Sequence, residues 1–221
     1  MNTLAPEAAR DAGPAQAERD AARLDVALID AGGANLGSVR YALQRLGVEP
    51  RIVRDADGLA CATRIILPGV GAAAPAMRAL RAGGLIEALR DSDVPLLGSC
   101  LGMQLLFAHS EEGDVDCLGL LPGVVRRMRP APGVRIPHMG WNRLRLRRET
   151  PLLAGIADGD HAYFVHGYAA PVGPACVAEA RHCDAFAAVV HHGRIAGAQY
   201  HPERSAAAGA RLLRNFLGGE A

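Results

Sequence analysis

Short apolar runs alternate with amphipathic segments over the first half of the chain. Four of these runs are followed by a glycine, a proline or a charged residue and predict strands, at 26–29, 51–53, 64–67 and 94–97. Between the first two, apolar residues recur at helical spacing, with Asn35 placed to cap a helix and Gly47 to end it. A second helix is predicted at about 76–90. This order predicts a parallel, doubly wound α/β sheet with its functional groups at the carboxyl ends of the strands.

The second half of the chain is richer in short strands. Candidate strands, separated by glycine or proline, lie at 123–128, 141–146, 162–168, 176–181, 186–190 and 195–199. Several of them are typical of antiparallel additions to the sheet, and a closing helix is predicted at 206–217. No repeat or long linker interrupts residues 25–219, which we expect to form the domain. Residues 1–23 are poor in apolar anchors and are expected to be a disordered tail.

Composition and charge exclude several classes of function. The 221 residues carry a formal net charge of +1, from 24 basic and 23 acidic side chains, which argues against a nucleic-acid-coating protein. Every basic residue is an arginine, so a lysine Schiff base, a pyridoxal phosphate anchor and a Walker-A loop are excluded. No apolar run is long enough to span a membrane, so no membrane partner is expected.

Cysteine and histidine usage bears on compartment and cofactors. The five cysteines include no C-x-x-C pair, and the N-terminus lacks a signal-peptide core. Both features favour a reduced, cytoplasmic protein. The eight histidines show no metal-ligand spacing, so neither a metal nor another cofactor is expected.

Cys100 stands in a pattern that is typical of an exposed nucleophile. Gly98-Ser99-Cys100-Leu101-Gly102 follows the predicted strand 94–97 and precedes an apolar run, 103–108, of helical character. This is a strand-turn-helix elbow with cysteine as the central residue. The flanking glycines allow the tight turn, and the helix amino terminus favours a thiolate. The alternative is a buried structural cysteine in a glycine-rich turn.

His201 and Glu203 can supply the base and the orienting acceptor that a cysteine nucleophile requires. Both follow the predicted strand 195–199, and Pro202 between them stiffens the turn. Taken singly, His201 could be an ordinary loop histidine and Glu203 a charge favoured at a helix amino terminus. Near Cys100, however, the two residues predict the remainder of a catalytic triad.

A glycine-rich turn follows the predicted strand 64–67. Its residues, Pro68-Gly69-Val70-Gly71, can present backbone N–H groups to an oxyanion or a substrate carboxylate. Alone it would indicate only a plain turn. Three such features at the carboxyl ends of three strands predict one active site.

Together these segments resemble the class I, triad-type glutamine amidotransferases. Further matches resemble the glutaminase subunits of imidazole glycerol phosphate synthase, from histidine biosynthesis. The matching segments lie at 35–39, 66–71, 98–104, 137–142, 163–166, 201–203 and 212–217. The resemblance extends from about 25 to 217. Its most discriminating part is Pro137-His138-Met139-Gly140-Trp141-Asn142, because the general amidotransferase motifs do not include it.

The resemblance implies an amidotransferase fold of flavodoxin-like type and a triad of Cys100, His201 and Glu203. Cys100 would attack the side-chain amide of L-glutamine, His201 would move the proton to the leaving ammonia, and Glu203 would hold the imidazole tautomer. The residues implied for the oxyanion and for glutamine are Gly69, Val70, Gly71, Leu101, Gln104, His166, Gly167 and Tyr168. Gly167 departs from the family pattern, which has serine at this position.

The resemblance also implies a heterodimer with a cyclase partner that is a (β/α)₈ barrel. The cyclase would use the ammonia to make imidazole glycerol phosphate and the aminoimidazole carboxamide ribotide. Tyr163, Trp141, His166 and Arg204 are the candidates for the docking surface around the ammonia exit.

Some alternatives stay open at this point. Eight arginines and no acidic residue lie between 126 and 148. They are interpreted first as a solvated basic face, with an acidic partner, an anionic ligand or RNA as alternatives. A stand-alone cysteine amidase, or an amidotransferase of another pathway, would share the triad. A non-catalytic binding protein is disfavoured because all three triad residues are present.

Overall fold

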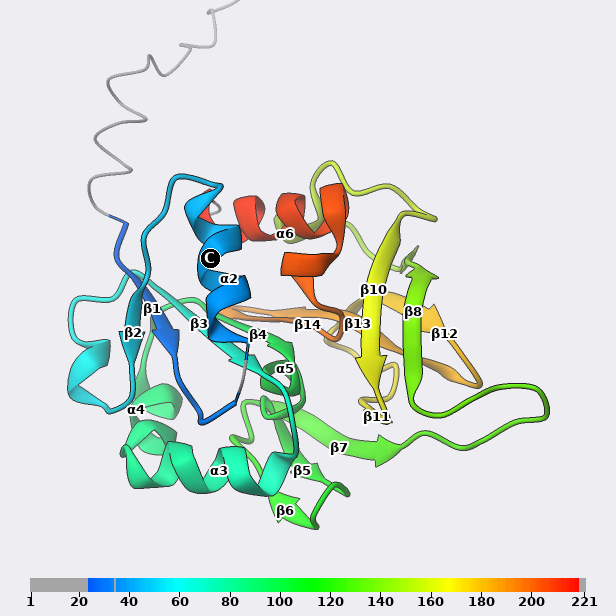
Figure 1. Cartoon of the computed structure of the whole chain (residues 1–221), viewed down its shortest axis with the longest axis horizontal. Coiled ribbons are helices and arrows are strands. Elements are labelled where there is room, and N and C mark those ends of the chain that lie inside the picture. The colour runs from blue at the N-terminus through cyan, green and yellow to red at the C-terminus, as the bar shows by residue number, and fades with distance from the viewer. Residues whose placement is uncertain (1–23, 34, 219–221) are drawn as a thin grey trace, which may run out of the picture.

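The computed structural model of the chain describes residues 24–33 and 35–218, so the expected tail at 1–23 lies outside the described residues (Figure 1). Its centre is an eight-stranded sheet. In spatial order the strands are β2 (Arg51–Val53), β1 (Val26–Ile29), β3 (Arg64–Gly69), β4 (Leu96–Cys100), β14 (Ile195–Ala198), β13 (Ala185–His192), β12 (Cys176–Arg181) and β9 (Arg145–Leu146). The first five are parallel and the last three are antiparallel, which confirms the predicted α/β sheet with antiparallel additions.

One strand of the second half extends the parallel part of the sheet. His201 was expected to follow the segment 195–199 into a parallel-sheet site, and β14 pairs in parallel with β4. This pairing has a functional consequence. Because Gly69 lies opposite Cys100 and Ala198 lies opposite Ser99, the carboxyl ends of β3, β4 and β14 coincide at one edge of the sheet.

Helices cover both faces of the sheet (Figure 1). Helices α2 (Leu36–Gln44) and α6 (Ala206–Gly218) pack on one face, and α3 (Ala73–Ala82) and α4 (Leu85–Asp91) pack on the other. Each central strand contributes to both cores; Val26 and Leu28 of β1 join the α2 and α6 side, and Ala27 and Ile29 join the opposite side. This alternation follows from the two-residue period of a strand and explains why the run is apolar throughout.

Two predicted helices differ from those observed. The helix expected at 76–90 is divided into α3 and α4 at Gly83 and Gly84, where Gly84 has a φ of +66°. A Cβ at Gly83 would lie 2.2 Å from the Arg54 carbonyl oxygen, so glycine permits a close approach there. The prediction of a helix at 103–108 is also wrong. Helix α5 is only Leu101–Gln104, and β5 (Phe107–Ser110) follows, because this segment pairs with residues 121–125.

Two smaller sheets lie beside the main one. One contains β11 (Tyr168–Ala169), β7 (Leu121–Arg127), β5 and β6 (Val115–Asp116), and the other pairs β8 (His138–Arg143) with β10 (His161–His166). Short 3-10 turns are η1 (Asp57–Leu59), η2 (Pro151–Leu153) and η3 (Pro202–Arg204). Within residues 24–33 and 35–218, no helix has the length and apolar character needed to cross a membrane.

Candidate active site

Cys100 stands at a strained turn between β4 and α5. Its backbone is in a sparsely populated region, with φ 51° and ψ −113°. The flanking glycines allow the chain to pass close to itself: a Cβ at Gly98 would lie 2.6 Å from the Gly102 carbonyl oxygen, and a Cβ at Gly102 would lie 1.7 Å from the Leu67 carbonyl oxygen. The elbow predicted from the glycine spacing is therefore present, and its strained residue is the cysteine itself.

The Cys100 side chain is not exposed as the elbow pattern predicts. The residue is only 6 % exposed, and its Sγ lies 3.7 Å from the Val165 carbonyl oxygen. The prediction was wrong because β10, which the sequence does not place over the elbow, covers the thiol. Cys100 instead lines a cavity of about 160 Å³.

His201 follows β14, and hydrogen bonds of its backbone hold it in place. Its amide donates to the Tyr163 carbonyl, and its carbonyl accepts from the Ser205 hydroxyl, at 3.0 and 2.7 Å. On one side the imidazole interacts with the Cys100 side chain, and on the other its Nδ1 lies 2.9 Å from Glu203 Oε1. The three predicted triad residues are therefore consecutive members of one polar chain.

The charges of this chain reinforce one another. Burial opposes a charged His201, but its hydrogen bonds with Cys100 and Glu203, and the charges of these two residues, raise its pKa above 6.5. Burial likewise opposes a charged Glu203, yet His201 holds the pKa of that carboxyl below its ordinary value. Since the pKa of His201 rises on folding and that of Glu203 falls, the pair stabilises the fold fully only between pH 4.5 and pH 6.5. This contribution is lost as the pH rises through the folded-state pKa of His201 or falls through that of Glu203.

Asn35 has a role that the sequence did not reveal. It was predicted to cap α2, but its side chain makes no capping hydrogen bond and its φ is 96°. Its Nδ2 instead donates to Glu203 Oε1 at 2.6 Å. Because the partners are 168 residues apart, only the fold could reveal this contact, although Asn35 does stand in one of the family-like segments.

The cavity beside Cys100 brings together most of the residues predicted to bind glutamine. Its lining includes Val70, Gly71, Leu101, Gln104, His166, Gly167, Tyr168 and His201. Gly69 and Glu203, which were also predicted for the site, are not among the residues that line it. The side-chain amide of Gln104 donates to the Tyr168 carbonyl at 2.8 Å and to Gln199 Oε1 at 3.1 Å, which fixes its orientation in the wall.

Glu112 also lines this cavity and was not predicted. Its carboxylate accepts the Ala73 amide at 3.1 Å, at the first turn of α3. Burial raises the pKa of Glu112, although this amide opposes the shift. No local motif marks Glu112, because it reaches the cavity from a turn after β5, a strand that the sequence predicted as helix.

The turn after β3 lies against the elbow. A Cβ at Gly69 would be 2.9 Å from the Leu101 Cβ and 3.0 Å from the Gly102 nitrogen, so a larger residue would not fit. On its other side, the Val70 backbone lies about as close to Gly33, where a Cβ would be 3.0 Å from the Val70 carbonyl oxygen. The backbone of this turn is therefore held between the elbow and the loop after β1.

Comparison with known proteins agrees with this geometry. Residues 27–218 match the family model "Glutamine amidotransferase class-I". The chain belongs to the class I glutamine amidotransferases. Solved structures support the same fold: a glutamine amidotransferase superposes with a TM-score of 0.67 at 24% identity, over 86% of this chain and 96% of that one. The PurLQS structure from Thermotoga maritima superposes with a TM-score of 0.65 at 22% identity, over 88% and 97%.

Curated relatives define the family more closely. The imidazole glycerol phosphate synthase subunit HisH of Xanthomonas axonopodis pv. citri is 68% identical over 87% of this chain and 96% of its own length. The subunit HisH of Xylella fastidiosa strain Temecula1 is 66% identical over the same shares. The chain therefore belongs to the HisH family of glutaminase subunits in histidine biosynthesis, and it is a glutamine amidotransferase.

An exposed aromatic surface lies beside the predicted triad. Trp141 and Met139 of β8 are 54 % and 65 % exposed. The Trp141 ring meets Tyr163 of β10 edge-on at 5.8 Å, and the Arg204 guanidinium lies 5.2 Å from the Tyr163 ring centroid. Because the Tyr163 carbonyl holds the His201 amide, this surface adjoins the triad. The structure thus brings the predicted Tyr163, Trp141 and Arg204 together, whereas His166 faces the cavity.

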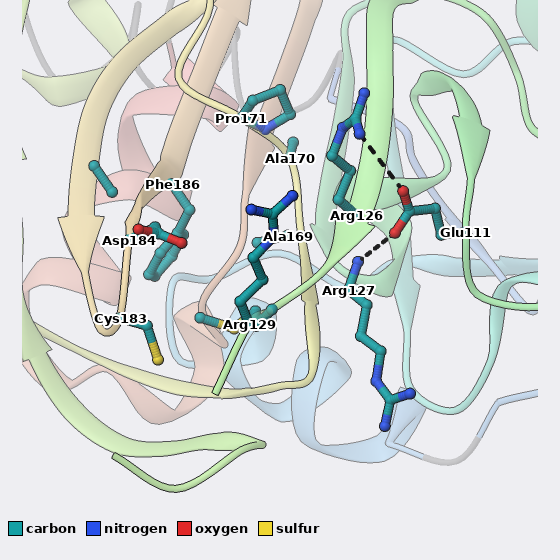
Figure 2. Close-up of a pocket in the computed structure, with 12 residues that line it drawn as sticks. Glu111, Arg126, Arg127, Arg129, Ala169, Ala170, Pro171, Cys183, Asp184 and Phe186 are labelled. Carbon is teal, nitrogen blue, oxygen red and sulfur yellow. Dashed lines mark hydrogen bonds and ion pairs between the residues drawn. The ribbon is translucent and has the colours of Figure 1, made fainter. Parts of the chain in front are cut away.

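A larger cavity, of about 260 Å³, lies near the amidotransferase site and receives part of the arginine-rich stretch (Figure 2). Arg126, Arg127 and Arg129 line it, with Cys183 and Asp184 among the other lining residues. Glu111 contacts the Arg126 guanidinium and the Arg127 amide.

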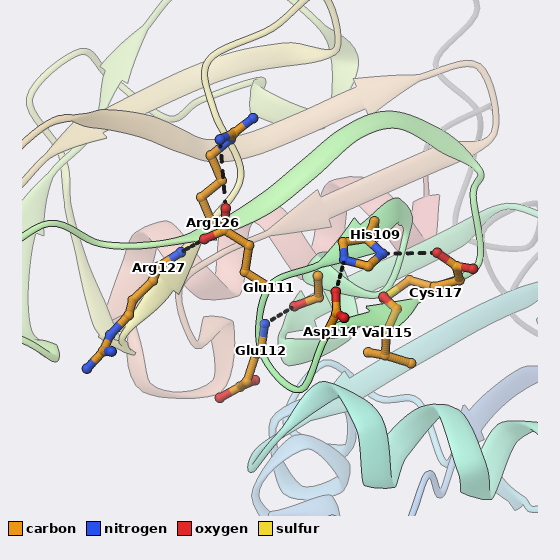
Figure 3. A network of polar contacts seen from close by, with 10 residues as sticks. His109, Glu111, Glu112, Asp114, Val115, Cys117, Arg126 and Arg127 are labelled. Carbon is orange, nitrogen blue, oxygen red and sulfur yellow. Dashed lines mark hydrogen bonds and ion pairs between the residues drawn. The ribbon is translucent and has the colours of Figure 1, made fainter.

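Glu111 and Glu112 are neighbours in the segment that follows β5 (Figure 3). Glu111 lines the larger cavity and Glu112 lines the cavity beside Cys100, so this segment borders both. His109 of β5 holds this segment through ring nitrogens that lie 3.0 Å from Asp116 and 3.2 Å from Asp114. Elsewhere, Arg145 and Arg147 pair with Glu179 of β12. Arg126, Arg145 and Arg147 of the arginine-rich stretch therefore pair with two separate acidic residues.

Among the residues that the structure describes, no group of three or more His, Cys, Asp or Glu side chains could hold a metal ion. All five cysteines are free.

Proposed function

We propose that this amidotransferase hydrolyses L-glutamine through a thioester on Cys100 and delivers the ammonia to a cyclase subunit. The observation that carries the proposal is the polar chain Cys100–His201–Glu203 beside a cavity that the glutamine-binding residues line. The free cysteines support a reduced, cytoplasmic location.

The first half of the reaction forms the thioester. The Cys100 sulfur attacks the side-chain amide carbon of glutamine, and the negative charge moves to the carbonyl oxygen. The backbone amides of Leu101 and of the Gly69–Val70 turn stabilise this oxyanion. A protonated His201 donates its proton to the amide nitrogen, the carbon–nitrogen bond breaks, and ammonia leaves.

The second half regenerates the enzyme. His201, now neutral, removes a proton from water, and the resulting hydroxide attacks the thioester carbon. The carbon–sulfur bond breaks, and glutamate leaves. Glu203 keeps the imidazole oriented with Nδ1 toward its carboxylate, and Asn35 donates a second hydrogen bond to the same carboxylate oxygen, Oε1.

The cavity lining supports recognition of an amino acid. Glu112 provides a carboxylate that can pair with the α-ammonium group of glutamine. Gln104 and the backbone near Gly71 and Tyr168 offer polar groups for the α-amino and α-carboxylate groups of the substrate. The reaction needs no cofactor, because the acid, the base and the nucleophile are all side chains.

The exposed surface formed by Met139, Trp141, Tyr163 and Arg204 supports a docking partner. An exposed tryptophan with an arginine and a tyrosine beside it is typical of interface hot spots. Its contact with the His201 segment would place the partner where ammonia is released. The chain would then supply ammonia to the cyclase without releasing it to solvent.

The function is tested with the chain and the cyclase subunit in equimolar mixture. Glutamate release from glutamine, and imidazole glycerol phosphate formation with glutamine as the only nitrogen source, are both expected. If the product formed from added ammonia alone and never from glutamine, the proposal would fail.

Glu203→Gln is expected to make the alkaline decline of kcat/KM begin at a lower pH. The Glu203 carboxylate is one cause of the raised pKa of His201, so without its charge the imidazolium deprotonates earlier. The loss in kcat should be roughly a hundredfold smaller than that caused by removing the nucleophile. The pH–rate profiles of both proteins measure this, and an unchanged alkaline limb would contradict the assigned role.

Trp141→Ala is expected to weaken cyclase binding by at least about 30-fold, as removal of an aromatic hot spot does. The matched control is Ile52→Ala, which also truncates an exposed apolar side chain but lies on edge strand β2. Isothermal titration with the cyclase gives both dissociation constants. Equal constants for the two variants would place the interface elsewhere.

A further inference from the structure

A chain of hydrogen bonds joins the strand below the docking surface to the wall of the glutamine cavity. Asn142 Nδ2 lies 3.2 Å from His138 Nε2, and His138 Nδ1 lies 3.1 Å from His166 Nε2. His166 Nδ1 in turn lies 2.9 Å from the Tyr168 carbonyl oxygen. These residues come from β8 and from the consecutive strands β10 and β11, which Gly167 alone separates.

The donors and acceptors in this chain can be assigned from its ends. The Asn142 Oδ1 accepts the Arg143 amide and its Nδ2 donates to the Arg181 carbonyl, so the amide orientation is fixed. His138 Nε2 therefore faces a donor and must be the unprotonated nitrogen, which places the proton on Nδ1. The His138 Nδ1–H therefore donates to His166 Nε2, and the His166 Nδ1–H donates to the Tyr168 carbonyl.

The surroundings keep both rings neutral. His138 and His166 are 3 % and 6 % exposed. Burial lowers the pKa of both imidazoles, to about 4 for His138 and about 3 for His166. Phe164 and His182 stack on the His138 ring, with centroids 4.9 and 4.2 Å from its own, so this ring has little freedom to turn.

One end of this chain of hydrogen bonds lies at the glutamine cavity, and the other lies on the strand that carries the docking surface. At one end, the Tyr168 carbonyl accepts hydrogen bonds from both His166 and Gln104, and all three residues line the cavity beside Cys100. At the other end, His138 and Asn142 lie on the inner face of β8, whose alternate residues Met139 and Trp141 are exposed.

We propose that His138 and His166 are positioning residues: a two-imidazole relay that fixes the Tyr168 carbonyl, and through it Gln104, from the strand that carries the docking surface. This inference rests on the proposed glutaminase function. Neither histidine takes part in proton transfer. They act on the shape of the glutamine cavity, so their loss should change the affinity for glutamine and not the rate of the chemical step.

Kinetics of the full chain with its cyclase test the relay through two substitutions of one residue. His138→Phe keeps a ring in the aromatic stack but removes both hydrogen bonds, and should raise KM for glutamine about tenfold with kcat nearly unchanged. His138→Asn removes the ring but places an amide nitrogen near the position of Nδ1, and should restore most of the lost affinity. The matched control, His182→Phe, keeps the stack and lies outside the relay, so its KM should stay at the wild-type value.

The outcomes separate the relay from mere packing. A wild-type KM for His138→Phe, or a His138→Asn variant more impaired than His138→Phe, would overturn the proposal. If the wild-type complex itself released no glutamate, the glutaminase function would fail instead.

A measurement on the unmodified protein decides the matter even where a variant does not fold. Long-range ¹H–¹⁵N correlation spectra report which imidazole nitrogen carries the proton. Both His138 and His166 are expected to be neutral and protonated on Nδ1 at pH 7. An Nε2–H tautomer or an imidazolium at either residue would break the chain of donors and overturn the proposal.

Discussion

Cys100→Ala is expected to abolish glutamine hydrolysis while leaving the protein folded. Without the sulfur no thioester can form, and loss of the nucleophile of a triad lowers kcat roughly a million-fold. The fold should persist because alanine occupies the same strained backbone as cysteine and only one buried atom is lost. Glutamate release measures the activity, and thermal unfolding of the two proteins measures the stability.

Cys176→Ala is the matched control for this substitution. Cys176 is as buried as Cys100, at 6 % exposure, and lies on β12 of the same sheet. Burial raises the pKa of its thiol to about 11, so it has no thiolate to offer at neutral pH. Wild-type activity is expected for this variant. Residual hydrolysis by Cys100→Ala, or its loss in Cys176→Ala, would contradict the assignment.

Cyclase and its nucleotide ligand are expected to raise the glutaminase rate by roughly 100–1000-fold over that of the isolated chain. This is the effect of one well-placed oxyanion donor. The Gly69–Val70 peptide is the element that would supply such a donor by rotating, because its first residue is glycine, which is free to adopt both signs of φ. Gly69 lies opposite Cys100 in the sheet register, so the rotation would occur beside the reacting carbon.

Three assays distinguish this gating from a stand-alone amidase: the chain alone, the chain with cyclase, and the chain with cyclase and its nucleotide. A ligand can shift the peptide only by its differential affinity for the two states, so the nucleotide should act through the cyclase and not on the chain alone. Equal rates in all three assays would show an enzyme that needs no partner.

The fold was predictable where the pattern of apolar residues depends on local geometry. Strands such as β1 and β3, and helix α6, bury faces whose periods are visible in the sequence. The prediction failed where distant contacts decide the structure. The segment after Gln104 has apolar residues suited to a helix, but its pairing with β7 makes it a strand.

The candidate site shows the same division. Cys100, His201 and Gly69 could be found because each follows a strand whose carboxyl end must lie at one edge of a parallel sheet. Asn35 and Glu112 could not, since their roles depend on partners that are 168 and 39 residues away. The burial of Cys100 was missed for the same reason, because β10 covers it from another part of the chain.

The central claim is that Cys100 forms the covalent bond with glutamine, and a glutamine analogue with an electrophilic side chain tests it most directly. After reaction, peptide mass spectrometry should find one modified cysteine, Cys100, although Cys61 is the exposed thiol. An excess of glutamine should protect it, since both compounds compete for the same cavity. Modification of Cys61 or Cys176 in its place, or labelling that glutamine does not slow, would contradict the account.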